Sequence, residues 1–112
     1  GFSQTLDGNG ETLSPMETVL LAVGACSSID VVDILKKRRL TIHDCQCELE
    51  AERAEEAPRV FTKIHAHYIV SGDNLKEKDV DRAVSLSAEK YCSVMLMLKG
   101  NVDITTSYTI VD

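Results

Sequence analysis

The sequence is poor in aromatic residues and in positive charge. It contains no tryptophan, and aromatic residues make up only 4% of its 112 residues. Acidic side chains outnumber basic ones by 18 to 12, so that the net charge is -6. Binding of single-stranded nucleic acid depends on aromatic platforms and a basic groove, and anionic membrane surfaces also attract basic proteins. The composition therefore argues against nucleic-acid and membrane partners.

The sequence also lacks a long uninterrupted apolar run. The most apolar stretch, residues 19–23, is soon followed by serines and aspartates, whereas a transmembrane helix needs about 20 predominantly apolar residues. Residues 1–11 have neither the basic start nor the apolar core of a signal peptide. We therefore expect no membrane span, a cytoplasmic location, and a single globular domain over residues 1–112.

Cysteine is present in a number that allows two interpretations. The four cysteines are Cys26, Cys45, Cys47 and Cys92. They could form two disulfide bridges, with three possible pairings. Because 44% of the residues are hydrophobic, the chain can build a core without such bridges. Reduced thiols, one or two of them chemically active, are the favoured interpretation.

Residues 14–37 are predicted to form a long helix at the centre of the fold. Ser14 can cap the first turn, Pro15 suits the first helical position, and Glu17 has the spacing of a capping box. Apolar residues surround the helix on almost all sides, which predicts a buried helix. Small residues flank Cys26 at its middle, so another element can approach this thiol closely.

The remaining chain alternates between strand and helix patterns. Residues 41–53 place Cys45 and Cys47 on an inner face, and residues 60–70 should pair with them as an antiparallel hairpin whose Val60 and Thr62 also face inward. The other expected elements are a short strand, an amphipathic helix, a short apolar helix ended by Gly100, and a last strand, at residues 2–6, 75–91, 93–99 and 102–111. This order predicts an α+β fold with a mostly antiparallel sheet wrapped around the long central helix.

Cys26 and Cys92 are the candidate reactive thiols. Cys92 lies near the start of a predicted helix, where the helix dipole can lower a thiol pKa. Two such thiols suit peroxide chemistry, in which a thiolate becomes a sulfenic acid and a second thiol condenses with it to a disulfide. The alternative is that both are small core residues, because free cysteine is among the most buried residue types. Spacing alone favours this second interpretation.

Three segments shift that balance because they resemble the OsmC/Ohr family of thiol-dependent peroxidases. They are SPMETVLLAVGACSSIDVV at residues 14–32, the pair Arg82-Ala83, and AEKYCSVMLML at residues 88–98. More narrowly, they resemble an OsmC-like branch of this family. The resemblance extends from about Asp7 to the C-terminus, and both cysteine motifs occur in the same order as in the family.

The resemblance implies an assembly, a reaction and roles for two residues. It implies an OsmC-like fold, an intertwined homodimer with its sites near the subunit interface, and a chain that lacks the family's first N-terminal strands. Cys26 would react with a small hydroperoxide and Cys92 would resolve the product, with a cellular dithiol as reductant. No cofactor and no metal are implied.

Two departures from the family pattern concern the activating residues. Peroxidases of this family use an N-terminal arginine to hold the thiolate, but no arginine precedes Arg38. They also carry glutamate directly after the proline, whereas here Met16 intervenes before Glu17. In a continuous helix Glu17 lies roughly 13–14 Å from Cys26 along the axis and on the opposite side. Glu17 therefore either caps its own helix or serves a site built with a partner subunit.

Several charged residues and two pairs of possible metal ligands could affect the thiols. Asp30, one turn beyond Cys26, should raise the pKa of that thiol, so activation needs Lys90, a helix end or another cation. His43 is a conceivable base on the face of the strand that carries Cys45, although a boundary position explains it as well. The pairs Cys45/Cys47 and His65/His67 should face opposite sides of the sheet, which argues against a shared tetrahedral metal site.

The sequence thus supports three hypotheses. The first is an enzyme that reduces hydroperoxides, preferably organic ones because apolar side chains surround Cys26, namely Val19, Leu20, Val23 and Ile29. The second is a dimer on the same scaffold that senses redox state or binds a small molecule without turnover, which the missing arginine favours. The third is a structural dimer with inert thiols.

Overall fold

The computed structural model describes residues 14–111 and confirms the α+β class. A segment of π-helix, Ser87–Tyr91, connects the second helix to the third. The other elements, in chain order, are α1 (Pro15–Lys37), β1 (Thr41–Arg53), β2 (Phe61–Asp73), α2 (Glu77–Leu86), α3 (Ser93–Leu98) and β3 (Asp103–Val111). The strand expected at residues 2–6 lies outside the described residues.

Helix α1 begins with the capping box that the sequence predicts. The Ser14 hydroxyl accepts the Glu17 backbone N–H at 3.2 Å, and the Glu17 carboxylate accepts the Ser14 N–H at 3.4 Å. Within the single chain α1 buries one stripe, which is formed by Val23, Gly24, Ser27, Val31 and Leu35. Leu21 and Ile29 are 53% and 62% exposed. The sheet therefore covers one face of α1, and the burial on all sides that the sequence predicts is not reached within one chain.

By composition, α1 has the length and hydropathy of a membrane span. An 18-residue window of this helix is apolar enough to cross a membrane. The serines and aspartates that follow residues 19–23 therefore do not by themselves exclude a span. The core helix of a soluble protein meets the same criterion. Here α1 packs Val31 and Leu35 into the cluster of buried residues beneath the sheet. This packing, and not its composition, identifies α1 as part of the core.

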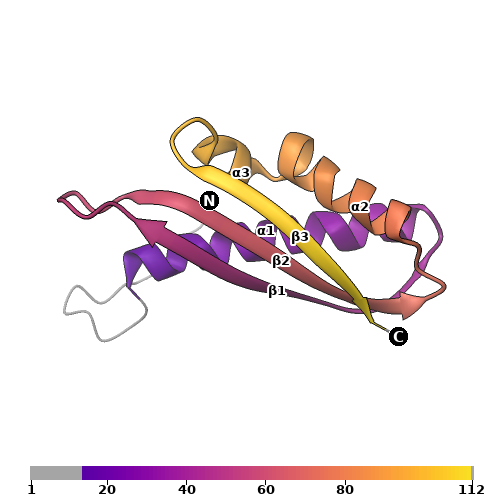
Figure 1. Ribbon diagram of the computed structural model, residues 1–112. Coiled ribbons are helices and arrows are strands. Elements are labelled where there is room, and N and C mark those ends of the chain that lie inside the picture. Colours follow the sequence, from indigo (N-terminus) through magenta and orange to yellow (C-terminus); the bar gives the residue numbers. More distant parts are fainter. Residues whose placement is uncertain (1–13, 112) are drawn as a thin grey trace, which may run out of the picture.

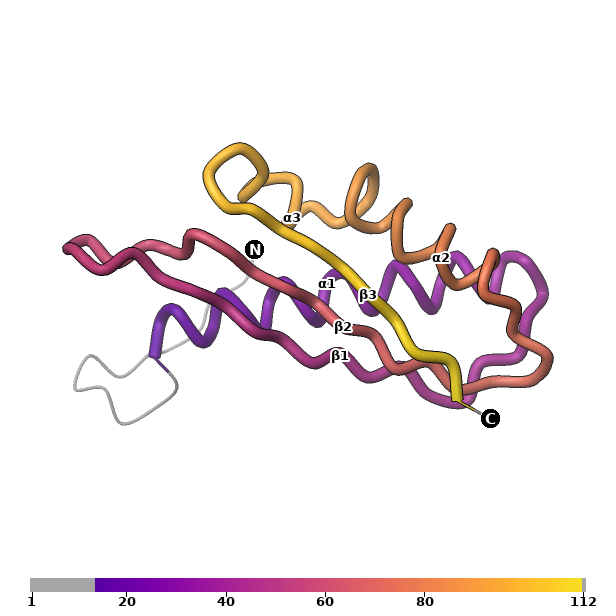
Figure 2. The backbone as a smooth tube through the Cα atoms, viewed as in Figure 1, coloured from indigo at the N-terminus to yellow at the C-terminus, as the bar shows by residue number. Residues whose placement is uncertain are grey.

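The described sheet has three strands in the order β1-β2-β3. β1 and β2 form an antiparallel hairpin, as predicted, but β2 and β3 pair in parallel. The pairing is parallel because the helices between these strands return the chain to the end of the sheet where β2 begins (Figure 1). The three α-helices lie on one face of the sheet (Figures 1 and 2). The turn between β1 and β2 extends beyond the point where β3 begins.

Two irregularities in the hairpin change which side chains face the helices. The register shifts between Ile42 and Asp44, so that Ile42 packs against the core while His43 is exposed. A second shift after Glu52 makes Phe61 a core residue. Strict alternation had placed His43 on the inner face of β1, and Val60 and Thr62 on that of β2. These three assignments are wrong, because each bulge inserts one residue and reverses the alternation beyond it.

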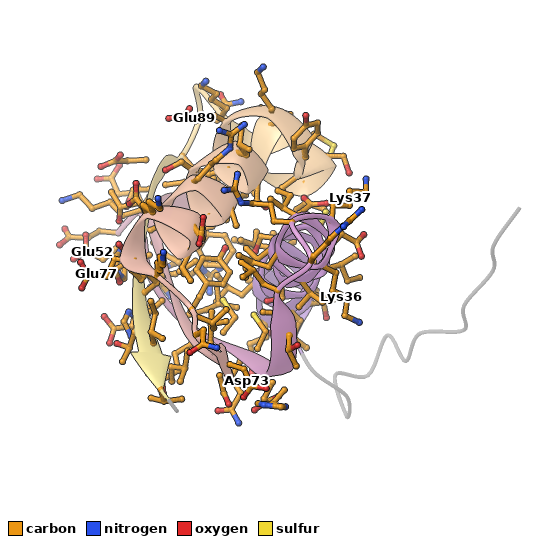
Figure 3. All side chains as sticks on the ribbon, turned by 90° about the vertical axis from the view of Figure 1, so that its right-hand side faces the viewer. Lys36, Lys37, Glu52, Asp73, Glu77 and Glu89 are labelled. Carbon is orange, nitrogen blue, oxygen red and sulfur yellow. The ribbon has the colours of Figure 1, made fainter. Side chains whose placement is uncertain are left out.

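The core lies between the concave face of the sheet and the helices. Figure 3 shows side chains filling the space between α1, α2 and the sheet, with labelled charged residues such as Lys36 and Glu89 at the periphery. Tyr68 of β2 is the largest side chain that is fully buried, and its hydroxyl donates to the Ser27 hydroxyl at 2.6 Å. Ser27 in turn donates to the Val23 carbonyl at 2.7 Å. This chain of hydrogen bonds connects the middle of α1 to the central strand.

The helix predicted at residues 75–91 is shorter and less regular than expected. β2 continues to Asp73, α2 begins only at Glu77, and the last turn is the π-helix Ser87–Tyr91. A π-helical turn adds a residue to the helical repeat and frequently occurs at functional sites. Here it leads directly into Cys92, the N-cap of α3. Gly100, with φ of 93°, follows α3 as predicted.

Candidate functional site

The fold brings Cys26 and Cys92 together, although they are far apart in the sequence. Cys26 lies in the middle of α1 and Cys92 at the N-cap of α3. The two sulfur atoms and a carboxylate oxygen of Asp30 all lie within 4.8 Å of one another. Cys92 is fully buried, whereas Cys26 and Asp30 are half-buried. Cys26 is therefore the thiol that a substrate can reach from solvent.

Hydrogen bonds make Cys26 the more acidic thiol. Burial raises its pKa, but the Val94 backbone N–H, the Cys92 thiol and the Ser93 hydroxyl outweigh this effect and lower the pKa below the ordinary value of 9.0. The Ser93 oxygen lies 3.8 Å from the Cys26 sulfur. The charge of Asp30 acts in the opposite direction, as the sequence predicted. Neutral donors thus stabilise the Cys26 thiolate against an adjacent negative charge.

Cys92 has the opposite character. The pKa of its thiol is raised to about 11, mainly by burial and also by the hydrogen bond with Cys26. The Met95 N–H, 3.5 Å from the sulfur, lowers the pKa by a smaller amount. The start of α3 does act to lower the pKa of Cys92, through the Met95 and Val94 N–H groups, but desolvation is the larger effect and the net shift is upward. Of the two thiols, Cys26 therefore ionises more readily and Cys92 less readily than an ordinary cysteine.

Asp30 is held in place by a residue of the π-helical segment. The Ser87 hydroxyl lies 3.1 Å from Asp30 Oδ2 and 3.3 Å from the Ser27 carbonyl oxygen. Ser87 is 1% exposed, so its position is set by packing. Sequence reasoning found Asp30 from its place one turn after Cys26, but it missed Ser87. The roles of Ser93 and Val94 were also missed, because only the tertiary contact of α3 with α1 reveals them.

The other charged candidates do not join the thiols within the described residues. Glu17 takes part in the capping box, which agrees with the first of the two roles considered for it. His43 pairs with Asp73 at 2.9 Å near the end of the hairpin. Lys90 is exposed on the π-helical segment. The Val94 N–H that lowers the pKa of Cys26 belongs to the first turn of α3. Of the three sources that the sequence proposed, a helix end is therefore the one found among the described residues, and Lys90 is not involved.

The remaining cysteines and histidines lie on opposite faces of the sheet, as predicted. Cys45 and Cys47 are free, half-buried and packed against the core, and burial raises the pKa of Cys47 to about 11. His65 and His67 are bonded on the outer face to three hydroxyl groups of β3, those of Thr105, Ser107 and Thr109. These four residues cannot surround one metal ion.

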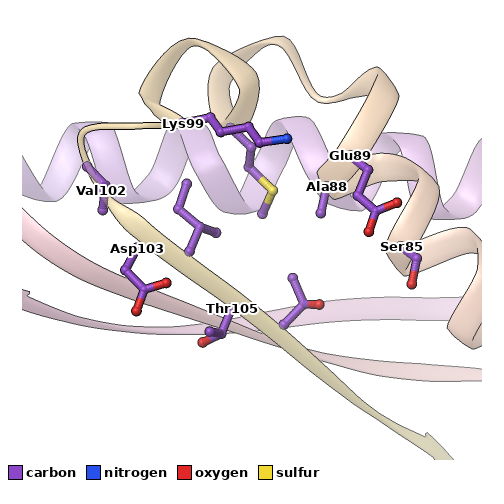
Figure 4. Close-up of a pocket in the computed structure, with 10 residues that line it drawn as sticks. Ser85, Ala88, Glu89, Lys99, Val102, Asp103 and Thr105 are labelled. Atoms are coloured by element: carbon purple, nitrogen blue, oxygen red, sulfur yellow. The ribbon is translucent and has the colours of Figure 1, made fainter.

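Neither of two pockets in the described residues is lined by Cys26 or Cys92. One, of about 400 Å³, is lined by Asp30, Arg82, Leu86 and Tyr91 among others, so it adjoins the site through Asp30. The other, of about 560 Å³, lies between α3 and the start of β3 and includes Lys99, Glu89 and Asp103 (Figure 4). The first pocket is the one that a ligand of the thiol site could use.

The fold and this geometry define a class: α+β proteins that hold two neighbouring thiols between a long helix and a short one. Residues 8–107 match the OsmC-like protein family. The chain therefore belongs to the OsmC-like family, which confirms the resemblance found in its motifs.

Three known proteins show how far the similarity extends in sequence and in fold. Protein YhfA of Escherichia coli K12 is 56% identical over 113 residues, which cover 99% of this chain and 84% of YhfA. A hypothetical protein from Aquifex aeolicus is 38% identical, with a TM-score of 0.86 over 90% of this chain and 76% of that one. The organic hydroperoxide resistance protein OhrB of Bacillus subtilis is 18% identical, with a TM-score of 0.62 over 90% and 74% of the chains. The first similarity indicates a YhfA-type branch, and the last concerns the fold alone.

Proposed function

We propose that this protein reduces organic hydroperoxides through Cys26 and Cys92. The observation that carries the proposal is the polarity of the pair: the partly accessible thiol has the lowered pKa, and the buried thiol beside it has a pKa raised to about 11. A thiolate is the nucleophile in such chemistry, whereas a resolving thiol acts only in the second step. Membership of the redox-active OsmC-like family supports the same conclusion.

The first step is attack of the Cys26 thiolate on the outer oxygen of the peroxide. The S–O bond forms as the O–O bond breaks, and the alkoxide leaves with a proton from solvent as an alcohol. Cys26 becomes a sulfenic acid, so the sulfur is oxidised by two electrons while the peroxide is reduced. The donors at Val94 and Ser93 stabilise the sulfur anion before this step.

The second step uses Cys92 to resolve the sulfenic acid. Its sulfur attacks the Cys26 sulfur, hydroxide leaves and takes up the Cys92 proton to form water, and a disulfide remains. A dithiol of the cytoplasm then returns two electrons and two protons to restore both thiols. Because the two sulfurs lie within 4.8 Å in the reduced protein, only small side-chain movements are needed to form the bond.

An organic substrate fits the surroundings of Cys26 better than hydrogen peroxide does. Ile29, one turn from Cys26 on α1, is 62% exposed. Val94, whose backbone N–H contacts the Cys26 sulfur, is half-buried. Val23, which the sequence had placed near the substrate, is fully buried in the core and is not available. The name of the B. subtilis relative of similar fold, an organic hydroperoxide resistance protein, agrees with this substrate class.

The exposed apolar face of α1 supports the homodimer that the family resemblance implies. Leu21 and Ile29 leave this face more than half exposed in the single chain. Exposed apolar residues on a long helix commonly mark an interface. A partner that covers this face would lie close to Cys26, because Ile29 is one turn away from it on α1.

A second candidate function is redox sensing or small-molecule binding without turnover. The observation that favours it is Asp30, because its charge opposes ionisation of the reactive thiol. The pocket of about 400 Å³ that adjoins Asp30 offers room for a ligand. In this case the thiol pair would oxidise slowly and the pocket would carry the function.

The deciding experiment measures thiol oxidation by intact mass and peptide mapping. The reduced protein receives one equivalent of cumene hydroperoxide or of hydrogen peroxide, with a chelator present. We expect a rapid Cys26–Cys92 disulfide, formed faster with the organic peroxide, and a sulfenic acid trapped on Cys26 in Cys92→Ser. Cys47→Ser is the matched control and should react like the unmodified protein. If both thiols stay reduced for minutes at neutral pH, the peroxidase proposal is wrong.

A further inference from the structure

We propose that the reduced thiol pair binds a zinc ion together with Asp30, and that the bound ion keeps the thiols from peroxide. The ligand atoms would be the sulfur atoms of Cys26 and Cys92 and one carboxylate oxygen of Asp30. These three atoms already lie within 4.8 Å of one another. This inference rests on the geometry of the reduced site and does not require that the protein turns over peroxide.

The distances in the reduced site are close to those of a zinc centre. Zinc binds thiolate sulfur at about 2.3 Å and carboxylate oxygen at about 2.0–2.2 Å, so two sulfurs on a tetrahedral ion lie about 3.8 Å apart. A set of atoms within 4.8 Å therefore has to contract by about 1 Å at most. Cys26 and Asp30 are four residues apart on α1, which places them on the same side of the helix.

The chemistry of the three ligands selects the kind of ion. Magnesium and calcium prefer sites made only of oxygen ligands, whereas thiolates favour zinc and softer ions. Three protein ligands leave the fourth zinc position open for water. Cys26 and Asp30 are half-buried, so this open position faces solvent and the ion can enter without unfolding.

The Ser87 hydroxyl holds the oxygen ligand, as expected in a metal site. It lies 3.1 Å from Asp30 Oδ2 and is itself buried, so it can orient the carboxylate. Asp30 is unfavourable for a free thiolate pair, because three negative charges would meet in one place. A divalent cation removes this repulsion. The same aspartate that hinders ionisation of Cys26 thus becomes a ligand when the ion is present.

Binding exchanges protons for the metal and transfers no electrons. The S–H bond of Cys92 breaks and its proton goes to solvent as the zinc–sulfur bond forms. Any proton on Cys26 is released in the same way. Both sulfur lone pairs that would attack a peroxide or a sulfenic acid are then engaged with zinc. Removal of the ion by a chelator restores the free pair.

The test uses the fully reduced chain, without peroxide. Zinc affinity is measured by competition with a chromophoric chelator, and cobalt(II) serves as a probe whose thiolate charge-transfer band reports sulfur ligation. We expect one ion per chain. Ser87→Ala should weaken binding about 10- to 100-fold, as is typical for residues that orient a ligand. Cys26→Ser, Cys92→Ser and Asp30→Asn should weaken it more.

Two variants control for charge and for unrelated thiols. Asp33→Asn removes an exposed carboxylate from the next turn of α1, and Cys47→Ser removes a half-buried thiol of β1 that is not one of the three proposed ligands. Both should bind zinc like the unmodified protein. The proposal is overturned if no ion binds, if Asp30→Asn binds as tightly as Asp33→Asn, or if Cys47→Ser abolishes binding. The peroxide assay with chelator tests the proposed function separately, so either can fail alone.

Discussion

At the scale of single residues, neutral hydrogen bonds set the reactivity of the site. The Val94 N–H and the Ser93 hydroxyl stabilise the Cys26 thiolate, while the nearest charge, that of Asp30, opposes it. Cys92 lies within 4.8 Å of Cys26 and yet its pKa is raised to about 11. Burial explains the difference, since Cys92 has no exposed surface and Cys26 is only half-buried.

This polarity predicts an order of alkylation with rising pH. Iodoacetamide reacts with the thiolate, so its rate at Cys26 should reach half its maximum at a pH below 9.0, the ordinary thiol pKa. The rate at Cys92 should still be rising near pH 11. Asp30→Asn should move the Cys26 profile to lower pH, because it removes a charge that raises the pKa of this thiol. Peptide mapping after timed alkylation measures both sites, and a Cys92 that reacts first would contradict the assignment.

Tyr68 provides a second prediction at this scale. Tyr68→Phe removes the hydrogen bond from the buried hydroxyl to Ser27, and Ser27 keeps its bond to the Val23 carbonyl. We expect the free energy of unfolding to fall by about 1 kcal/mol, the usual net value of such a bond. Urea denaturation measures the change.

Tyr108→Phe is the matched control for that variant. Its hydroxyl donates to the Glu77 carbonyl at 3.4 Å near the edge of the sheet, and its loss should alter stability by less than about 0.5 kcal/mol. If both variants lose the same free energy of unfolding, the buried hydrogen bond to Ser27 is worth no more than the exposed one, and the prediction is wrong.

At the scale of elements, the connections between strands and helices decide where the thiols lie. The π-helical turn Ser87–Tyr91 ends α2 and positions both Ser87 and Cys92 against α1. At the other end of the fold, β1 and β2 approach each other closely at Gly72. A Cβ atom added at Gly72 would collide with the Thr41 backbone carbonyl oxygen, which cannot move without breaking the strand pairing.

Alanine substitutions at two glycines test this difference. Gly72→Ala should reduce the free energy of unfolding by about 3 kcal/mol, because overpacking against backbone has no cheap relief. Gly24→Ala is the control: its Cβ would lie 2.8 Å from Leu49 Cδ1, the end of a flexible side chain. Improved helix propensity of about 1 kcal/mol offsets that strain. Thermal and urea unfolding compare the two, and a similar loss in both would refute the argument.

At the scale of the whole molecule, one face of α1 is left exposed by the elements that residues 14–111 form. Leu21 and Ile29 are 53% and 62% exposed, although the apolar residues around α1 predicted a helix buried on all sides. The opposite stripe of α1 packs into the core beneath the sheet. We propose that a second copy of this chain covers the exposed face.

We expect Ile29→Lys to convert the proposed homodimer to a monomer. A lysine at this position introduces a charge into an interface that would otherwise bury apolar surface, while the fold of the single chain does not depend on the exposed side chain. Sedimentation velocity measures the assembly, and circular dichroism confirms the fold. Val60→Lys, at a position that is 54% exposed beyond the hairpin strands, serves as the control and should remain dimeric. A protein that sediments as a monomer without substitution would exclude the dimer.

Much of the fold could be read from local patterns, and the departures have local causes. The capping box, the apolar periodicity and the alternation in residues 41–53 predicted α1 and β1 with their observed bounds. The bulges that expose His43 and Val60 left no mark in composition, because a bulge depends on the partner strand. The π-helical turn was also missed, because the apolar pattern of residues 75–91 is that of an ordinary helix.

The sequence by itself determined the class of the protein, its family, its central helix and its two candidate cysteines. These follow from capping, periodicity and motifs, all of which act between residues close together in the chain. Only the tertiary structure decided that Cys26 is the more acidic thiol, that Asp30 and Ser87 join it, and that one face of α1 stays exposed. Burial and hydrogen bonding at the site depend on α1, the π-helical turn and α3 meeting in space, and no local pattern encodes that meeting.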